Sequence, residues 1–212
     1  MTAENAATLW AERRGWFFKP IQGFGARGAY RGDKLTRRVW QQIGAGGYVV
    51  DASGLTNSSG WSLDAGDVNG DGKLDLIAAQ DQADLNSRTN SGSVFVVFGK
   101  STTTTVNLAS LGTDGWRIDG ASSGIKAGYN VGAGDVTGDG KADILVGANL
   151  ADNNFRTDSG SVWVVFGKAG TGNVDLNSLG SAGYRIDGAV SLDELSSATA
   201  LPDMNGDGIG EV

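Results

Sequence analysis

The amino-acid sequence predicts an all-β fold built from repeated four-stranded units, and three observations support this. First, the chain repeats itself at a spacing of 68 residues: residues 47–114 laid over 115–182 without gaps give 32 identities. Second, each repeat holds short branched apolar runs separated by Gly, Asn, Asp and Ser, the pattern of strands and turns. Third, no segment keeps a helical apolar period for three turns, so no long helix is expected.

Each repeat should contain four short strands. In the second copy they lie near residues 128–136, 142–146, 161–166 and 184–186, and the first copy has matching segments at 74–78, 93–98 and 116–118. The third of these strands, Val94 to Phe98, is apolar throughout, as expected for a strand covered on both faces by neighbouring units. Four-stranded units in tandem predict β-propeller blades, because a single blade cannot bury its own apolar face. A parallel β-helix is the alternative, but its repeats are normally much shorter.

The repeat also predicts how the chain is divided. Residues 47–114 are expected to form a first blade, 115–182 a second and 183–212 the start of a third. A propeller usually needs about four to eight blades to close. We therefore expect an incomplete propeller, either a fragment or a chain that needs further blades or self-association. Residues 1–46 form a basic Gly/Arg-rich segment, expected to be a linker and otherwise unassigned.

Composition excludes several classes of function. The sequence has no Cys and no His, which removes disulfides, thiolate chemistry, Ser-His triads and the commonest transition-metal ligand. The net charge of −7 argues against nucleic acid as a partner. No apolar run approaches the ~20 residues of a membrane span, and the first residues lack the apolar core of a secretory signal. Nothing in the chain supplies a nucleophile or a tuned acid–base pair, so we expect no enzymatic activity.

The most informative motif is a nine-residue turn that occurs three times, beginning at Asp67, Asp135 and Asp203. Oxygen-bearing side chains occupy positions 1, 3, 5 and 9, and glycines occupy positions 4 and 6. Position 7 can contribute its backbone carbonyl. The candidate metal ligands are therefore Asp67, Asn69, Asp71, Lys73 and Asp75 in the first turn, Asp135, Thr137, Asp139, Lys141 and Asp143 in the second, and Asp203, Asn205, Asp207, Ile209 and Glu211 in the third.

This donor set predicts a hard cation, most plausibly Ca²⁺. The two glycines should adopt the positive φ values that a tight curl needs, and the ninth-position acid should close the coordination shell. The helix–loop–helix calcium motif is excluded, because its acid at position 12 is replaced by Ala78 and Val146 and the flanks are strand formers. A plain Asx-rich turn without metal is the remaining alternative. The third turn is the weakest candidate, because Glu211 replaces Asp at its ninth position.

With these turns in place, residues 47–212 resemble the FG-GAP repeat family, the blades of integrin α-chain propellers and of many bacterial surface proteins. The family pattern combines an aromatic–glycine pair, the calcium turn, an apolar strand ending in Gly-Ala-Pro and a Gly-x-Val-Tyr-Val-like strand. The matching segments are Gly60-Trp61 and Gly128-Tyr129 (in inverted order), Gly147-Ala148 without the proline, and the strands 92–96 and 160–164. The pattern is broken at Ala79-Gln80, at Ser196-Ser197 and at Pro202.

The resemblance implies a β-propeller with structural Ca²⁺ between the first two strands of a blade, on an extracellular or cell-surface protein. We expect an adhesion or protein-interaction module whose partner is a protein or a glycan. A propeller accessory to an extracellular phospholipase or polysaccharide-acting enzyme, and a carbohydrate-binding lectin, are the alternatives.

Two further patterns repeat with the same period. Asp84 with Arg88, and Asp152 with Arg156, are expected to form a structural ion pair within each blade, and a ligand site is the alternative. The tryptophans Trp61, Trp116 and Trp163 could stack on sugars, but repeat positions shared with Tyr and Phe are more often core.

Overall fold

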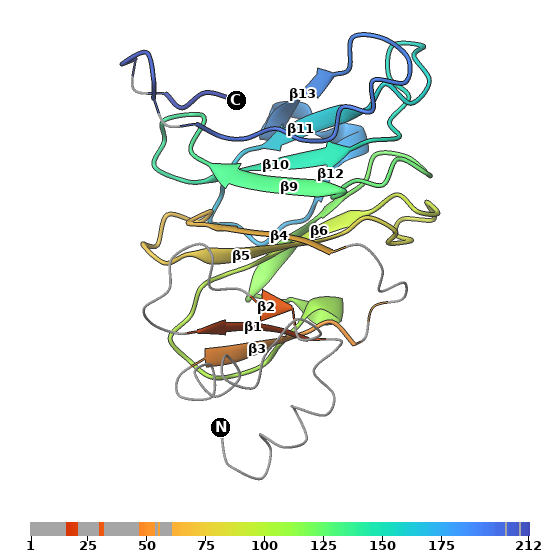
Figure 1. Ribbon diagram of the computed structural model, residues 1–212. Coiled ribbons are helices and arrows are strands. Elements are labelled where there is room, and N and C mark those ends of the chain that lie inside the picture. Colours follow the sequence, from red (N-terminus) through yellow and green to blue (C-terminus); the bar gives the residue numbers. More distant parts are fainter. Residues whose placement is uncertain are drawn as a thin grey trace.

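The residues that the structure describes form three β-sheets stacked one above another (Figure 1). The computed structural model describes residues 16–20, 30–31, 47–53, 55, 61–201, 203–207 and 209–212. In these residues the ordered elements are strands and short 3-10 helices, and no α-helix occurs. The all-β prediction is therefore confirmed. The rest of the basic segment 1–46, Gly60 and Gly208 lie outside the described residues. Over the described ranges, no helix has the length and hydropathy of a membrane span.

The strands of each sheet come from nearby parts of the chain, except that the first and middle sheets each also hold one short strand from further along the chain. The first sheet has the order β2-β1-β3-β7, with β1 Trp16–Pro20, β2 Tyr30–Arg31, β3 Gly47–Asp51 and β7 Val106–Asn107. The middle sheet has the order β12-β8-β6-β5-β4, with β4 Trp61–Gly66, β5 Asp75–Gln80, β6 Ser93–Val97, β8 Gly115–Asp119 and β12 Val174–Asp175. The last sheet has the order β13-β11-β10-β9, with β9 Asn130–Gly134, β10 Asp143–Ala148, β11 Ser161–Val165 and β13 Gly183–Asp187.

Four antiparallel strands form the body of the middle and last sheets, as the sequence predicts. In the middle sheet β4, β5, β6 and β8 are joined by antiparallel pairing, and β9, β10, β11 and β13 pair the same way. These sheets are propeller-type blades, and the stack of sheets is not closed into a propeller. The fourth strand of each of these two sheets, β8 or β13, lies in the following 68-residue repeat of the sequence. The partition into residues 47–114, 115–182 and 183–212 thus remains a prediction about sequence repeats.

Two short strands, β7 and β12, join the sheet that precedes the sheet of the strand before them in the chain. β7 pairs in parallel with β3, placing Val106 opposite Val50. β12 pairs in parallel with β8, placing Val174 opposite Ile118. Both continue into one turn of 3-10 helix, η4 Leu108–Ser110 and η5 Leu176–Ser178. Each crossing therefore fastens a repeat to the sheet that precedes it.

The core lies between the sheets, because the central strands are apolar on both faces. All residues of β5, β6, β10 and β11 are buried, as predicted for the run beginning at Val94. One face of the middle sheet packs on the first sheet around Tyr48 and Phe95. The opposite face packs on the last sheet around Trp116 and Trp163. The predicted core role is confirmed for both tryptophans, which are at most 2% exposed; the side chain of Trp61 is outside the described set.

Candidate metal centre

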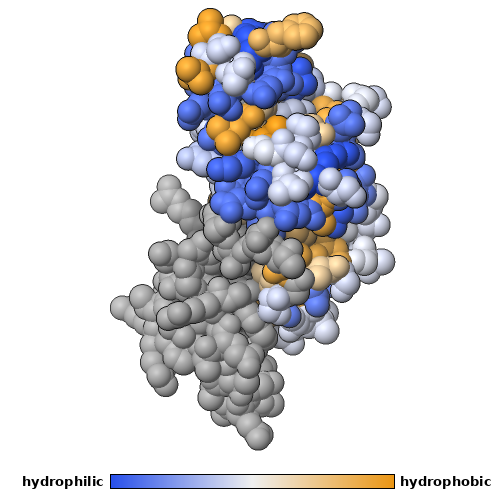
Figure 2. Space-filling view, turned by 90° about the vertical axis from the view of Figure 1, so that its right-hand side faces the viewer, coloured by the Kyte–Doolittle hydropathy of each residue, from blue (hydrophilic) through white to orange (hydrophobic). Residues whose placement is uncertain are grey.

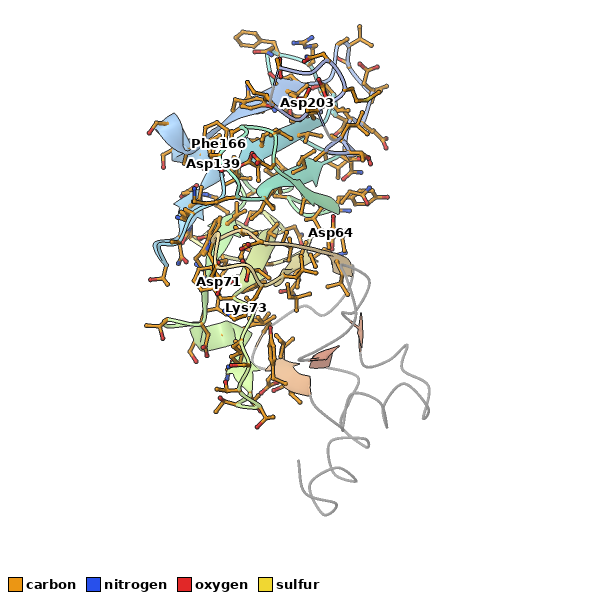
Figure 3. All side chains as sticks on the ribbon, turned by 90° about the vertical axis from the view of Figure 1, so that its left-hand side faces the viewer. Asp64, Asp71, Lys73, Asp139, Phe166 and Asp203 are labelled. Atoms are coloured by element: carbon orange, nitrogen blue, oxygen red, sulfur yellow. The ribbon has the colours of Figure 1, made fainter. Side chains whose placement is uncertain are left out.

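The three Asp-rich turns follow one another along the chain, the first in the middle sheet, the second in the last sheet and the third after the last sheet. The first joins β4 to β5 and the second joins β9 to β10. The third lies between Leu201 and Glu211, whose backbones exchange two hydrogen bonds. The labelled aspartates Asp71, Asp139 and Asp203 come from these turns, at successive levels of the molecule (Figure 3). The first two turns thus lie at equivalent places in the middle and last sheets, and the third follows the last sheet in the chain.

The first-position carboxylate organises the turn from inside. Asp67 Oδ1 accepts the backbone N–H groups of Gly70 and Asp71, at 2.8 and 3.1 Å, and Asp67 Oδ2 accepts that of Gly72 at 2.8 Å. The chain can curl this tightly because Gly70 and Gly72 have φ values of 77° and 82°, a region where a side chain is strained. The positive φ predicted for both glycines is therefore confirmed.

Positions 3, 5 and 7 form a chain of short-range contacts. Asn69 Oδ1 accepts the backbone N–H of Asp71 at 2.9 Å, and Asp71 Oδ1 accepts that of Lys73 at 2.9 Å. The ammonium of Lys73 then turns back and donates to Asp71 Oδ2 at 2.7 Å (Figure 3). The lysine side chain at position 7 thus forms an ion pair with the carboxylate at position 5, and this ion pair was not predicted from the sequence.

The acid at the ninth position is buried and accepts hydrogen bonds from the backbone of two segments. Asp75 is 0% exposed; its Oδ2 accepts the backbone N–H of Val68 at 2.9 Å, and its Oδ1 accepts that of Gly99 at 2.7 Å. The carboxylate therefore ties the start of the turn to the segment that follows β6. Coordination of a metal by this side chain remains a prediction, and it would have to use the lone pairs that these two bonds leave over.

The second turn reproduces this geometry almost bond for bond. Asp135 accepts the backbone N–H groups of Gly138, Asp139 and Gly140 at 2.7–3.2 Å. Lys141 Nζ donates to Asp139 Oδ2 at 2.7 Å. Asp143, again 0% exposed, accepts the N–H groups of Val136 and Gly167 at 3.0 and 2.9 Å.

The third turn keeps the same frame in the residues that the structure describes. Asp203 Oδ1 accepts the N–H of Gly206 at 2.6 Å, Asn205 Oδ1 accepts that of Asp207 at 2.9 Å, and Asp207 Oδ1 accepts that of Ile209 at 2.9 Å. The longer Glu211 still reaches back to the N–H of Met204 at 2.9 Å. Its substitution for Asp therefore preserves the closing bond of the turn.

Electrostatics separates the fifth position from the ninth. Burial acts to raise the pKa of Asp71, but hydrogen bonds from Lys73 outweigh it and lower the pKa. The hydrogen bond from Lys141 likewise lowers the pKa of Asp139. Desolvation raises the pKa of Asp143, despite its two backbone donors. The charged form of the fifth-position carboxylates is thus stabilised by the neighbouring lysine, whereas burial disfavours the charged form of Asp143, the ninth-position carboxylate of the second turn.

The turns have the chemistry of a calcium site. Their side-chain donors are carboxylate, amide and hydroxyl oxygens, which suit a hard cation, and Asp- and Asn-rich turns of this kind are typical of Ca²⁺ sites. Each of the first two already holds an ammonium group on its fifth-position carboxylate. Among the described residues, no three acidic side chains converge with the geometry of a finished metal site. The donor set fits the cation, and its individual ligands remain predictions.

The predicted pairing of Asp84 with Arg88 within one blade is wrong, because each residue has a different partner. Arg88 makes a bidentate ion pair with Asp175 of β12, at 2.8 and 2.7 Å, and also donates to the carbonyl of Gly120 at 2.5 Å. Asp84 Oδ1 instead accepts the backbone N–H of Asn90 at 2.6 Å. The arginine therefore connects two repeats. The sequence signal for this was the acid at 175, within the Val-Asp-Leu segment that matches Val-Asn-Leu at 106–108.

Comparison with known families agrees with this geometry. The family model named FG-GAP repeat matches residues 59–97 and 127–165. The chain carries two FG-GAP repeats. Each matched FG-GAP segment spans the first three strands of one sheet together with its acidic turn, namely β4–β6 and β9–β11. A search of curated proteins found no match.

Proposed function

We propose that this chain is a calcium-binding segment of a β-propeller that serves as a non-catalytic adhesion or protein-interaction module at the cell surface or outside the cell. Its metal ions are structural. The observation that carries the proposal is the recurrence, in both FG-GAP repeats, of an oxygen-lined turn with the same internal hydrogen bonds. FG-GAP blades are often associated with calcium binding and adhesion, which supports the same assignment.

The proposed metal binds where the turn gathers charge. Asp67, Asp71 and Asp75 bring three carboxylates into one nine-residue segment, and a divalent cation removes their mutual repulsion. Because the metal binds the folded turn, it stabilises the fold by mass action. The ligands join the two strands that flank the turn, so the metal acts as a clamp within a blade.

The lysine at position 7 gives this proposal a specific signature. Lys73 Nζ holds the oxygen of Asp71 that a cation would take, so metal binding has to displace it. Replacing Lys73 with Met keeps the backbone carbonyl at position 7 and removes the competitor. Calcium affinity should therefore rise in Lys73→Met, the opposite of what substitution of a ligand does.

Calorimetric titration of the full chain with CaCl₂ tests the proposal. We expect two or three sites with dissociation constants of about 10⁻⁵–10⁻³ M, the range of extracellular modules, and a rise in melting temperature. The double variant Asp71→Ala/Asp139→Ala should lose two sites. Asp64→Ala is the matched control, because its carboxylate lies on β4 outside the turns (Figure 3). Absence of heat and of any thermal shift in the unsubstituted protein would refute calcium binding.

The interaction half of the proposal rests on an exposed aromatic residue. Phe155 lies in the loop between β10 and β11, fully exposed, with a φ of 61°. A bulky residue in this region of φ is a genuine outlier, and the first repeat holds the small polar Ser87 at the same place with a φ of 59°. An apolar side chain held out on a constrained loop is suited to contact another protein.

A pull-down with immobilised chain tests this half separately. A specific partner that is captured by the unsubstituted protein should be lost with Phe155→Ser, which restores the residue of the first repeat. The calorimetric calcium signal should not change in that variant. Equal recovery of the partner by both proteins would rule out Phe155 as the contact.

A further inference from the structure

The outer edge and exposed face of β13 differ from the matching surface of the middle sheet. In the middle sheet, β12 covers the outer edge of β8. In the last sheet, β13 is the end strand of the order β13-β11-β10-β9. The two end strands are equivalent in the repeat, since β8 and β13 lie 68 positions apart. The middle sheet therefore shows what the edge of β13 accommodates.

Four contacts hold the segment at β12 on β8. Val174 and Asp175 pair in parallel with Ile118 and Asp119. The side-chain oxygen of Asn173 accepts the backbone N–H of Arg117 at 3.0 Å. Leu176 and Val174 enter the core cluster beside Trp116. Asp175 forms the bidentate ion pair with Arg88. The bound segment is therefore Asn-Val-Asp-Leu, and each of its four residues takes part in at least one of these contacts.

The corresponding apolar surface of the last sheet is open. Trp116 and Ile118 on β8 are 0% and 1% exposed, whereas Tyr184 and Ile186 at the same places on β13 are 43% and 37% exposed. In Figure 2, apolar residues reach the surface at the end of the molecule that carries the last sheet. Val174 of β12 and Leu176 of η5 belong to the buried cluster that contains Trp116 and Ile118, and no corresponding segment lies on β13 among the described residues.

The arginine of the last sheet is poised as its counterpart is. Arg156 donates to the carbonyl of Ala189 at 2.5 Å, just as Arg88 donates to that of Gly120. Arg88 adds Asp175, whereas the Nε of Arg156 is buried without a hydrogen-bond partner. Arg88 binds Asp175 through Nη1 and Nη2, and Arg156 has no acidic partner among the described residues, so its Nη atoms offer the equivalent binding point for a carboxylate.

The acids around this surface are already satisfied. Asp187 on β13 receives hydrogen bonds from Arg185, Asn154 and Ser161 at 2.7–3.0 Å. Asp119 on β8 receives the same three kinds of donor from Arg117, Asn86 and Ser93. The last sheet thus has every fixed part of the site that holds Asp175 in the middle sheet.

We propose that the edge of β13 binds the Asn-Val-Asp-Leu segment of a further repeat unit of this type. The segment pairs in parallel with β13, its valine opposite Ile186, its aspartate on Arg156 and its leucine over Tyr184. A second copy of this chain is not the occupant, because its own Val174 and Asp175 are already paired with β8. The inference depends on the repeat and not on metal in the turns.

A peptide with the sequence of residues 170–179 is the probe. Titrated into the full ¹⁵N-labelled chain, it should shift the amide resonances of Gly183–Asp187 and the Nε–H of Arg156. A second arrangement appends the same ten residues to Val212 through a Gly/Ser linker, which raises the effective concentration to about the millimolar range. In that fusion Tyr184 fluorescence should change and the melting temperature should rise.

Three matched changes decide the outcome. Arg156→Ala and an Asp→Asn change at the peptide position of Asp175 should each weaken binding at least about tenfold, since each removes a charge-assisted pair. Arg88→Ala should leave the affinity at β13 within about twofold, because that site is separate. If neither peptide nor fusion perturbs the Gly183–Asp187 amides, or if Arg156→Ala leaves both effects unchanged, the proposal is wrong.

Discussion

The middle and last sheets have related sequences and the same four-stranded body, but the middle sheet is enclosed and the last sheet is open at its β13 edge. The middle sheet lies between two core clusters and carries a fifth strand. The last sheet shares one cluster and is covered on its other face by the smaller set around Leu145 and Val164, with residues 195–200. Burial in this chain is therefore decided by neighbours and not by the local sequence of a repeat.

The largest test of this comparison replaces the equivalent aromatics. Trp116→Ala should lower the free energy of unfolding by roughly 3–5 kcal/mol, the usual cost of emptying a buried aromatic site. The loss includes the contact with the ammonium of Lys168, 4.3 Å above the ring. Tyr184→Ala, at 43% exposure, should cost less than half as much. Urea unfolding of both variants measures the difference, and equal losses would contradict the idea that enclosure distinguishes the sheets.

A second test asks whether the last sheet is open only on its outer face. Asp75→Ala and Asp143→Ala each leave two backbone N–H groups without their acceptor, and both carboxylates are 0% exposed. Each variant should lose roughly 2–4 kcal/mol, and the two losses should agree. Unfolding in EDTA keeps metal out of the measurement. A much smaller loss in Asp143→Ala would show that the whole last sheet is loosely held.

A third test uses pH on the connection between repeats. Hydrogen bonds from Arg88 lower the pKa of Asp175, so its stabilisation is present above the ordinary aspartate pKa of about 3.9 and is lost as pH falls through the lower, folded value. Because both side chains are partly exposed, Asp175→Asn should cost about 1 kcal/mol at pH 7. The two proteins should converge in stability toward pH 2. A gap that stays constant from pH 7 to pH 2 would show that the ion pair does not contribute.

The smallest effect is expected at the most exposed aromatic residue. Phe155 has no apolar surface to lose, and its φ of 61° suits Asn better than Phe. Phe155→Asn should therefore change stability by less than about 0.5 kcal/mol, or raise it slightly. Thermal unfolding measures this, and a clear loss would mean that Phe155 packs on the molecule.

Much of the blade could be predicted because its signals are local. Positive φ at Gly70 and Gly72, the doubly buried strand beginning at Val94, and the strand that follows each acidic turn all depend on a few adjacent residues. The internal repeat then carried each signal to the next copy. The tryptophans at 116 and 163 were correctly placed in the core for the same reason.

The remainder depends on residues far apart in the chain. The partner of Arg88 is 87 positions away, and β12 pairs with β8 of the middle sheet although the strand before it, β11, belongs to the last sheet. Alignment of the chain with itself gives the length of the repeat, but it does not show which copy of the repeat supplies the partner of a given side chain or strand. The sequence predicted Asp75 as a metal ligand but not its hydrogen bonds to the backbone, one of which comes from Gly99, 24 residues downstream.

The crossing strand also sets an order of events during synthesis. The middle sheet has its four antiparallel strands once residue 119 has been made, but its fifth strand ends at Asp175. At about 5–20 residues per second, Trp116 waits several seconds before β12 and η5 cover it. Until then the apolar face of β8 lacks the cover that β12 and η5 supply, so this part of the chain is open to intermolecular contact while it is being made.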